Sequence, residues 1–346
     1  MLRKTLYILF VALCAATAVE SYARYRFADL VDRSRFEDMA FIRLLNSGVI
    51  YHPGTGNYDQ RFGFLLTPNS RETVHTDEYR YTIRTNSLGF RTHELEPKPQ
   101  GQRRLMLLGD SMIFGVGVDY PASIPALLEQ MQDSLKVYNF STLGHNTAQS
   151  LIAARAFSTQ VEPDLILCGV FIGNDLISNA LNYADEQNHI ATHHQQVATT
   201  RDRLLATLAP YAWSTTTRAL IYSIYIPRLR YQLAAETNII TATIRHLIEI
   251  KRTAGAAGSD FATLLIYPKD AVGGGLIEQW SQSRDPGRRL ARACRDQGIK
   301  VLDLLDHITG TADERRYYFE QDGHFNATGN TRVAELIYEH WLEPTH

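Results

Sequence analysis

Short apolar runs alternate with amphipathic helical patterns from about residue 104 onward, and this alternation restricts the possible folds more than any other feature of the chain. The apolar runs lie at 105–108, 137–140, 165–171, 261–267 and 301–305. Runs of this length, bounded by turn residues, are typical of strands buried on both faces. Between them, apolar residues recur at helical spacing, as at Ile124, Leu127, Leu128 and Met131. The pattern therefore predicts an α/β fold with a doubly wound, mostly parallel five-stranded sheet.

Length and composition narrow the class of protein. The 346 residues suit one decorated α/β domain as well as two smaller domains. The chain carries 35 Lys+Arg against 37 Asp+Glu, and this balance argues against nucleic acid as a partner, since nucleic-acid binders usually show a basic patch or stripe. The three cysteines, Cys14, Cys168 and Cys294, exclude a disulfide framework as the organising principle.

The N-terminus has a basic start followed by an apolar stretch, Leu6–Val19. A run of this size is typical of a secretory signal and is shorter than the roughly 20 residues of a full membrane span. Residues 1–19 are therefore predicted to be a signal peptide, cleaved after Ala18, or an uncleaved signal anchor. Both interpretations predict an exported protein, either periplasmic or attached to the membrane through residues 5–19.

Two further regions lie outside the strand–helix alternation. Residues 20–100 are polar and aromatic with many turn signals, which predicts an N-terminal extension with little core of its own. Residues 180–238 interrupt the predicted catalytic domain, 101–346, and interleave tyrosines with arginines. A helical insertion that long is typically a lid or binding element. A cap that only fills space is an equal alternative, and a membrane-surface role is a third.

Polar residues follow the predicted strands at the edge where open α/β sheets bind ligands. Ser111, Gly144 and Asn174 follow the first, second and third strands. Asp322 and His324 lie between the last strand and the last helix. Each segment alone would be interpreted as a turn or a helix cap. Four such segments at successive strand ends favour a shared site.

These residue types fit nucleophilic catalysis. A serine needs an adjacent base, and His324 can take the Ser111 proton and return it to the leaving group. A carboxylate on the far ring nitrogen orients the imidazole, and Asp322 is the candidate, with Glu320 as the fallback. The backbone N–H groups of Ser111 and Gly144, with the side-chain amide of Asn174, are the predicted oxyanion donors.

Several other residues have weaker functional interpretations. Asp110 and Asp175 are predicted to hold loops beside the site. Arg84 and Arg91 could bind an anionic substrate, but surface salt bridges are the preferred interpretation.

No metal or cofactor is predicted. His193 and His194 lack a partner at ligand spacing and are interpreted as a solvated stretch. Gly273–Gly275 lacks the Lys-Ser/Thr of a phosphate loop and is interpreted as a flexible turn.

Together the four segments resemble the SGNH hydrolase superfamily, also called the GDSL family. Gly109–Met112 is similar to its first block, with Met112 where Leu is usual, and Gly144, Asn174 and His324 match the later blocks. The resemblance covers roughly residues 85–342 without the insertion. It implies a flavodoxin-like three-layer α/β/α domain and ester hydrolysis or acyl transfer through an acyl-enzyme.

The chain departs from the family pattern at two further positions. Ile172 stands where the third block usually has Gly, and Gln321 stands where the last block usually has Asp. Asp322, two residues before His324, resembles the arrangement in exopolysaccharide O-acetyltransferases of the same superfamily.

The leading functional hypothesis is a serine esterase that hydrolyses small O-acyl esters, with acetyl on a small molecule or glycan as the expected substrate. The alternatives are an O-acyltransferase that modifies an exported polysaccharide and a catalytically silent carbohydrate-binding subunit. The oligomeric state stays open.

Overall fold

A computed structural model describes residues 2–33, 35–37, 56–57, 59–181, 205–273, 281–308 and 314–343. Its centre is a five-stranded sheet in the order β6-β5-β7-β8-β9, and every neighbouring pair is parallel. The strands are β5 (Arg103–Leu108), β6 (Leu135–Asn139), β7 (Leu165–Phe171), β8 (Asp260–Ile266) and β9 (Lys300–Asp303). Counted along the chain, this is the 2-1-3-4-5 order of flavodoxin-like folds. The predicted fold class and its five strands are confirmed.

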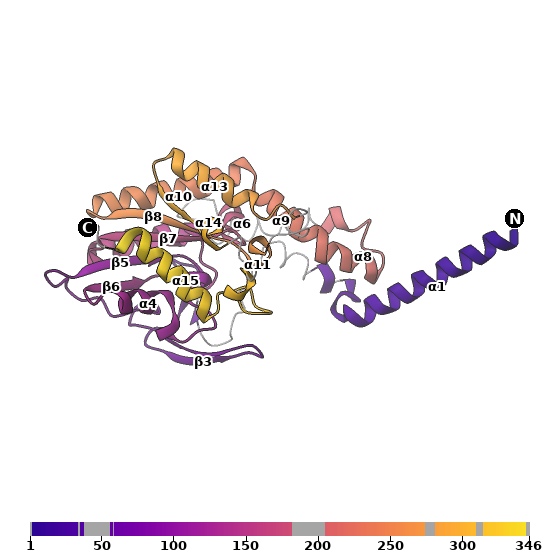
Figure 1. Cartoon of the computed structure of the whole chain (residues 1–346), viewed down its shortest axis with the longest axis horizontal. Coiled ribbons are helices and arrows are strands. Elements are labelled where there is room, and N and C mark those ends of the chain that lie inside the picture. The colour runs from indigo at the N-terminus through magenta and orange to yellow at the C-terminus, as the bar shows by residue number, and fades with distance from the viewer. Residues whose placement is uncertain are drawn as a thin grey trace.

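Helices cover both faces of the sheet (Figure 1). One layer contains α4 (Ile124–Met131) and α15 (Ala327–Ile337), and the other contains α5 (Thr147–Val161), α10 (Thr237–Ala256) and α13 (Asp285–Asp296). The short elements beside them are α3 (Ser111–Phe114), η2 (Tyr120–Ala122), α6 (Asp175–Leu181), α11 (Lys269–Val272), α14 (Leu305–Ile308), η4 (Glu314–Tyr317) and η5 (Tyr338–Leu342). The result is a three-layer α/β/α domain.

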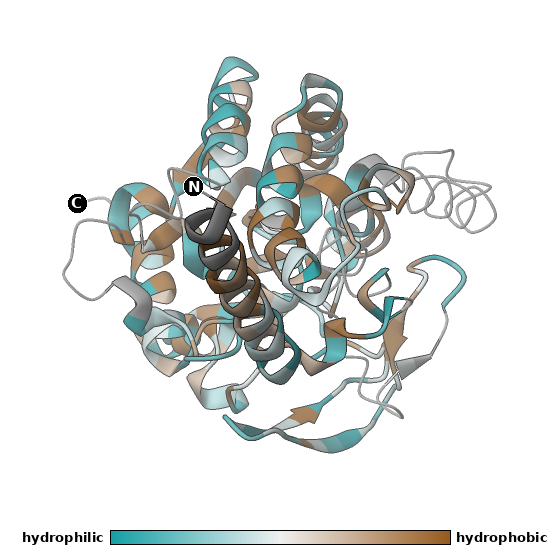
Figure 2. Ribbon diagram, turned by 90° about the vertical axis from the view of Figure 1, so that its right-hand side faces the viewer, coloured by the Kyte–Doolittle hydropathy of each residue, from teal (hydrophilic) through white to brown (hydrophobic). Residues whose placement is uncertain are grey.

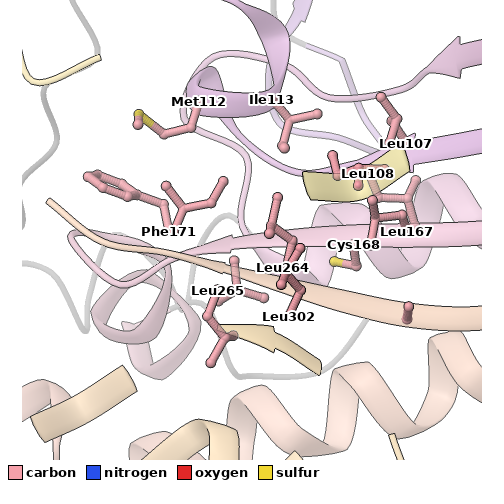
Figure 3. Packing of buried hydrophobic residues seen from close by; sticks show 14 of the residues in the cluster. Leu107, Leu108, Met112, Ile113, Leu167, Cys168, Phe171, Leu264, Leu265 and Leu302 are labelled. Carbon is pink, nitrogen blue, oxygen red and sulfur yellow. The ribbon is translucent and has the colours of Figure 1, made fainter. Parts of the chain in front are cut away.

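The main hydrophobic core lies along the sheet (Figure 3). All seven residues of β7 are buried, as expected for a central strand covered on both faces. Ile113 of α3 packs closely onto β7, because a Cβ at Gly169 would lie only 2.5 Å from Ile113 Cγ1. Packing at Gly169 therefore lets the segment after Ser111 rest directly on the centre of the sheet.

Part of the N-terminal extension forms antiparallel hairpins: β3 (Arg71–His75) pairs with β4 (Arg80–Arg84), and β1 (Gly56–Asn57) with β2 (Leu65–Leu66). The inner face of β3–β4 buries Val74, Tyr81 and Ile83 in one cluster with Phe114 and Leu143 of the α/β domain. The extension thus shares its core with the loops that follow β5 and β6.

A long helix, α1 (Leu2–Arg26), projects from the domain at one end (Figure 1). It extends past the predicted apolar run, and Ile8–Arg26 is long and apolar enough to cross a membrane. Such a helix is compatible with a signal peptide or an anchor. A short turn, η1 (Ala28–Leu30), follows it.

The described part of the insertion is helical. Residues 205–208 are helical and turns follow them. An uninterrupted helix then runs through α8 (Thr215–Leu220), the π-helix η3 (Ile221–Tyr225) and α9 (Ile226–Ala234). Residues 182–204 lie outside the described residues.

Candidate active site

Ser111 lies at the carboxyl edge of the sheet because the chain turns sharply after β5. Gly109 has φ +150°, and a Cβ there would approach Ile113 Cγ1 to 2.9 Å. Asp110 then caps α3, since its Oδ1 accepts a 3.0 Å hydrogen bond from Met112 N. Ser111 is the first residue of that helix, and its side chain lies at the rim of the sheet.

His324 reaches Ser111 from the loop before α15. Its Nε2 lies 2.8 Å from Ser111 Oγ, and its Nδ1 lies 2.5 Å from Asp322 Oδ1. The same carboxylate oxygen accepts a 2.8 Å hydrogen bond from His324 N, which fixes the loop around the histidine. The structure therefore brings together the three residues predicted as a triad, although 213 positions separate Ser111 from His324.

The fallback acid, Glu320, does not contact His324. Its side chain is exposed, and its carbonyl oxygen accepts a 2.7 Å hydrogen bond from Lys269 Nζ. Lys269 Nζ also donates to the carbonyl oxygen of Phe319, at 2.7 Å. Lys269 therefore holds the backbone of this loop, and Asp322 is the carboxylate that contacts the imidazole.

Asp322 has a second partner that the sequence did not reveal. Tyr79, at the tip of the β3–β4 hairpin, donates a 2.7 Å hydrogen bond from its hydroxyl to Asp322 Oδ2. The neighbouring Glu78 carboxylate accepts the backbone N–H of Asp322 at 2.8 Å and that of Gln321 at 3.0 Å. Two residues of the N-terminal extension therefore hold the acid that orients His324.

The electrostatics keep Asp322 ionised. Burial alone would raise the pKa of this carboxyl, but hydrogen bonds from His324 and Tyr79 outweigh burial and lower the pKa to about 2. Burial and the adjacent Asp322 charge together raise the pKa of Tyr79, so that its hydroxyl stays a donor. An ionised carboxylate of this kind can stabilise the imidazolium that forms when His324 takes a proton.

The three predicted oxyanion donors lie in the segments that follow β5, β6 and β7. Gly144 adopts φ +70° in the loop after β6, and this loop is tied to Gly109, whose carbonyl oxygen accepts Thr142 N at 3.3 Å. Within the described residues, neither Ser111 N–H nor Gly144 N–H has a hydrogen-bond acceptor. The Asn174 side chain donates to the Asp110 carboxylate, and a second N–H of the amide remains.

The two buried aspartates at this rim hold loops, as their sequence context suggested. Asp110 caps α3, and Asp175 Oδ2 accepts Phe171 N at 3.0 Å. Burial raises the pKa of Asp110 to about 6, and burial together with the Asp110 charge raises the pKa of Asp175. Ile172 stands where the third block of the family usually has Gly. Its side chain is buried, and its N–H donates to Ile266 O at 2.8 Å.

One of the two predicted arginines, Arg91, differs from the prediction. Arg91 is only 2% exposed, and its guanidinium donates to backbone carbonyls, including those of Gly115 and Val118 at 2.8 Å. The surface salt bridge expected for Arg91 is therefore wrong, because the guanidinium closes the turn after α3. Arg84 lines a cavity of about 530 Å³ together with Arg71, Arg91 and Asp119.

The remaining candidates lie mostly outside the described residues. His193, His194 and two of the glycines in Gly273–Gly275 belong to undescribed segments. Among the residues that are described, no group of three or more His, Cys, Asp or Glu side chains could hold a metal ion.

No protein-family model matches the chain, and no curated protein is significantly similar to it. Several solved structures are similar at low identity. The lipase Lip_vut3 from a goat rumen metagenome is 15% identical, covers 69% of this chain and 97% of its own, and has a TM-score of 0.44. A lipolytic G-D-S-L family member from Veillonella parvula is 12% identical (70% and 100% coverage, TM-score 0.40). The psychrotrophic esterase EstA from Pseudoalteromonas sp. is 14% identical (69% and 96%, TM-score 0.40). Likeness this distant carries no functional argument, so the chemistry must follow from the side chains of this chain.

Proposed function

We propose that the protein is a serine hydrolase that cleaves small O-acyl esters through Ser111, His324 and Asp322. One observation carries the proposal: a continuous chain of contacts, 2.8 Å from Ser111 Oγ to His324 Nε2 and 2.5 Å from His324 Nδ1 to Asp322. This geometry suits a nucleophile, a general base and an orienting acid. The GDSL-like motifs around Ser111 support the same chemistry.

In the first half-reaction, Ser111 Oγ attacks the ester carbonyl carbon while its proton moves to His324 Nε2. The carbonyl oxygen becomes negatively charged and accepts hydrogen bonds from Ser111 N–H, Gly144 N–H and the Asn174 amide. The intermediate then collapses: the bond to the alcohol oxygen breaks, and the alcohol leaves with the proton from His324. The acyl group remains on Ser111.

In the second half-reaction, a water molecule replaces the alcohol. His324 removes a proton from the water as its oxygen attacks the acyl carbon, and the same three donors hold the oxyanion. Collapse releases the carboxylic acid and returns the proton to Ser111. Throughout, the ionised Asp322 keeps the imidazole in the tautomer that accepts the proton on Nε2.

Acetyl on a carbohydrate is the substrate class that we propose. Two observations support it: α1 fits an exported or anchored protein, and the Asp322-Gly323-His324 spacing resembles that of polysaccharide O-acetyltransferases. The same spacing favours acyl transfer to a glycan as the second candidate. The two reactions share the acyl-enzyme and differ in whether water or a sugar hydroxyl attacks it.

The proposal is tested with the purified full-length chain and p-nitrophenyl acetate. Ser111→Ala should lower turnover by at least about 10⁴-fold without changing the circular dichroism spectrum, because the nucleophile is lost and the fold is not. Ser134→Ala is the matched control, because Ser134 is exposed and lies just before the amino end of β6, at the opposite edge of the sheet. A fluorophosphonate probe should label the wild type and Ser134→Ala but not Ser111→Ala.

Unchanged turnover or labelling in Ser111→Ala would refute the proposal and favour a silent binding subunit. Hydrolase and transferase are separated by product analysis. With an acetylated donor and a glycan acceptor, a hydrolase releases acetate, whereas a transferase yields acetylated glycan.

A further inference from the structure

Large exposed apolar side chains are confined to one end of the molecule. On α1 and the turn after it they include Phe10 at 63%, Leu13 at 66% and Tyr25 at 85% exposure. In the insertion they form a second set, here called the insertion patch: Tyr211, Trp213, Leu220, Ile224 and Tyr225, between 42% and 77% exposed. Elsewhere in the described residues no large apolar side chain is exposed to this degree. Such confinement marks an interaction surface rather than scattered surface hydrophobicity.

The two sets are physically joined. The Glu20 carboxylate on α1 accepts hydrogen bonds from Thr215 N at 3.0 Å and Thr216 N at 2.9 Å, at the start of α8. A separate small core, which includes Leu30, Leu208 and Ala219, lies beneath this junction. The base of α1 and the start of α8 therefore form one packed unit. In Figure 2, viewed from this end, the middle of α1 is coloured hydrophobic.

The position of the junction matches a membrane interface. Lys4 and Glu20, the charged residues that flank the apolar run, are separated by about 24 Å along α1, somewhat less than the ~30 Å thickness of a bilayer hydrocarbon core. Glu20, the first charged residue after the apolar run, would then lie at the headgroup level. Trp213, two residues before Thr215, would lie at the same level, which is the depth that Trp and Tyr prefer.

We propose that the insertion patch docks on the lipid surface from which α1 emerges, so that the protein contacts the bilayer through two elements rather than one. The patch supplies aromatic and aliphatic side chains for the interface, and α1 supplies the span. Leu220 and Ile224, four residues apart, extend the contact along one face of the helix. This inference does not depend on the proposed ester chemistry.

The docked insertion would also orient the catalytic rim. The helix from α8 through η3 to α9 leads from the junction to Tyr231, whose hydroxyl lies 3.0 Å from the Asp270 carboxylate. Asp270 follows β8 at the carboxyl edge, next to Lys269, which holds the His324 loop. In Figure 1, α9 and α11 lie between the sheet and α8. The rise from Thr215 to Tyr231 is about 24 Å, so Tyr231 lies within about that distance of the junction.

Two native reporters test the proposal in the full-length protein, reconstituted into phosphatidylcholine vesicles. Cys14 is the exposed thiol of the three cysteines, since Cys168 and Cys294 are buried, and its maleimide reactivity measures insertion of α1. Trp213 measures patch depth in a Trp280→Phe/Trp341→Phe variant, by quenching with lipids brominated near the headgroup. The matched control is Trp213→Phe/Trp280→Phe, which keeps Trp341, a partly buried residue packed on the main core.

We expect Cys14 to become unreactive, Trp213 fluorescence to fall by more than half and Trp341 fluorescence to change little. Adding Leu220→Ser and Ile224→Ser to the Trp213 protein should reduce the quenching at least twofold while Cys14 stays protected. Protected Cys14 with Trp213 quenched no more than Trp341 would overturn the proposal, since α1 would then be a tether without a docked patch. Reactive Cys14 would overturn it too, because the patch would have no inserted helix beside it.

Discussion

The two oxygens of the Asp322 carboxylate are held by two different regions of the molecule. Oδ1 belongs to the α/β domain, where it contacts His324 only two residues away, at both Nδ1 and the backbone N–H. Oδ2 belongs to the N-terminal hairpin, where it accepts the Tyr79 hydroxyl from 243 positions earlier. The α/β domain supplies the three proposed catalytic side chains, and the hairpin holds one of them, Asp322, in place. If this division is correct, substitutions in the domain should cost far more activity than substitutions in the hairpin.

The largest expected effect lies on the domain side. Asp322→Asn should lower kcat for p-nitrophenyl acetate by about 10⁴-fold, because an amide neither stabilises the imidazolium nor favours the tautomer that accepts a proton on Nε2. Glu320→Gln is the matched control and should stay within about twofold, since the Glu320 side chain is exposed and does not contact His324. A larger loss in Glu320→Gln than in Asp322→Asn would reverse the assignment of the acid.

A smaller loss is expected at the oxyanion donors. Asn174→Ala removes the one side-chain donor and leaves the Ser111 and Gly144 N–H groups, so kcat should fall by about 10²–10³-fold. KM should change little, since the hydrogen bond strengthens only when the carbonyl oxygen becomes charged. If KM instead rose by about 10²–10³-fold while kcat stayed unchanged, Asn174 would be a substrate-binding residue.

On the hairpin side, Tyr79→Phe should lower kcat by about tenfold, the equivalent of one hydrogen bond to a charged group. Tyr81→Phe is the matched control: Tyr81 lies on β4 of the same hairpin with its ring 5.8 Å from that of Tyr79, and it donates no hydrogen bond to Asp322. If Tyr79→Phe lost as much activity as Asp322→Asn, the hairpin would be as essential for catalysis as the α/β domain.

The same variant has a pH signature in stability. The Tyr79 hydrogen bond helps to lower the pKa of Asp322 from 3.8 to about 2. A lowered carboxyl pKa stabilises the fold fully above the unfolded value and loses that contribution as the pH falls through the folded value. Urea denaturation should therefore show a larger difference in free energy of unfolding between wild type and Tyr79→Phe at pH 7 than at pH 2, the folded pKa of Asp322. A difference independent of pH would mean that Tyr79 acts through packing alone.

The α/β domain could largely be predicted from the sequence, whereas the contacts of the N-terminal hairpin could not. Periodicity placed all five strands, and residues that follow strand ends placed Ser111, Gly144 and Asn174 at one rim, because the carboxyl ends of parallel strands share an edge. Tyr79 had no such signal. Its segment alternates like an edge strand, and alternation indicates which face is buried but not which distant loop that face meets. The burial of Arg91 could not be predicted for the same reason, since a contact with residues distant in the sequence leaves no local pattern.

The smallest expected effect is at Glu78, which contacts only the backbone of the acid's loop. Glu78→Gln keeps an oxygen that can accept the Asp322 N–H but removes the charge, so kcat should fall no more than about threefold and the free energy of unfolding by about 1 kcal/mol. Glu72→Gln, on β3 of the same hairpin, is the control and should leave kcat unchanged. If Glu78→Gln lowers kcat more than Tyr79→Phe does, the hairpin acts mainly by positioning the backbone at Asp322. The Tyr79 hydrogen bond to Asp322 Oδ2 would then contribute less to activity than the Glu78 contact.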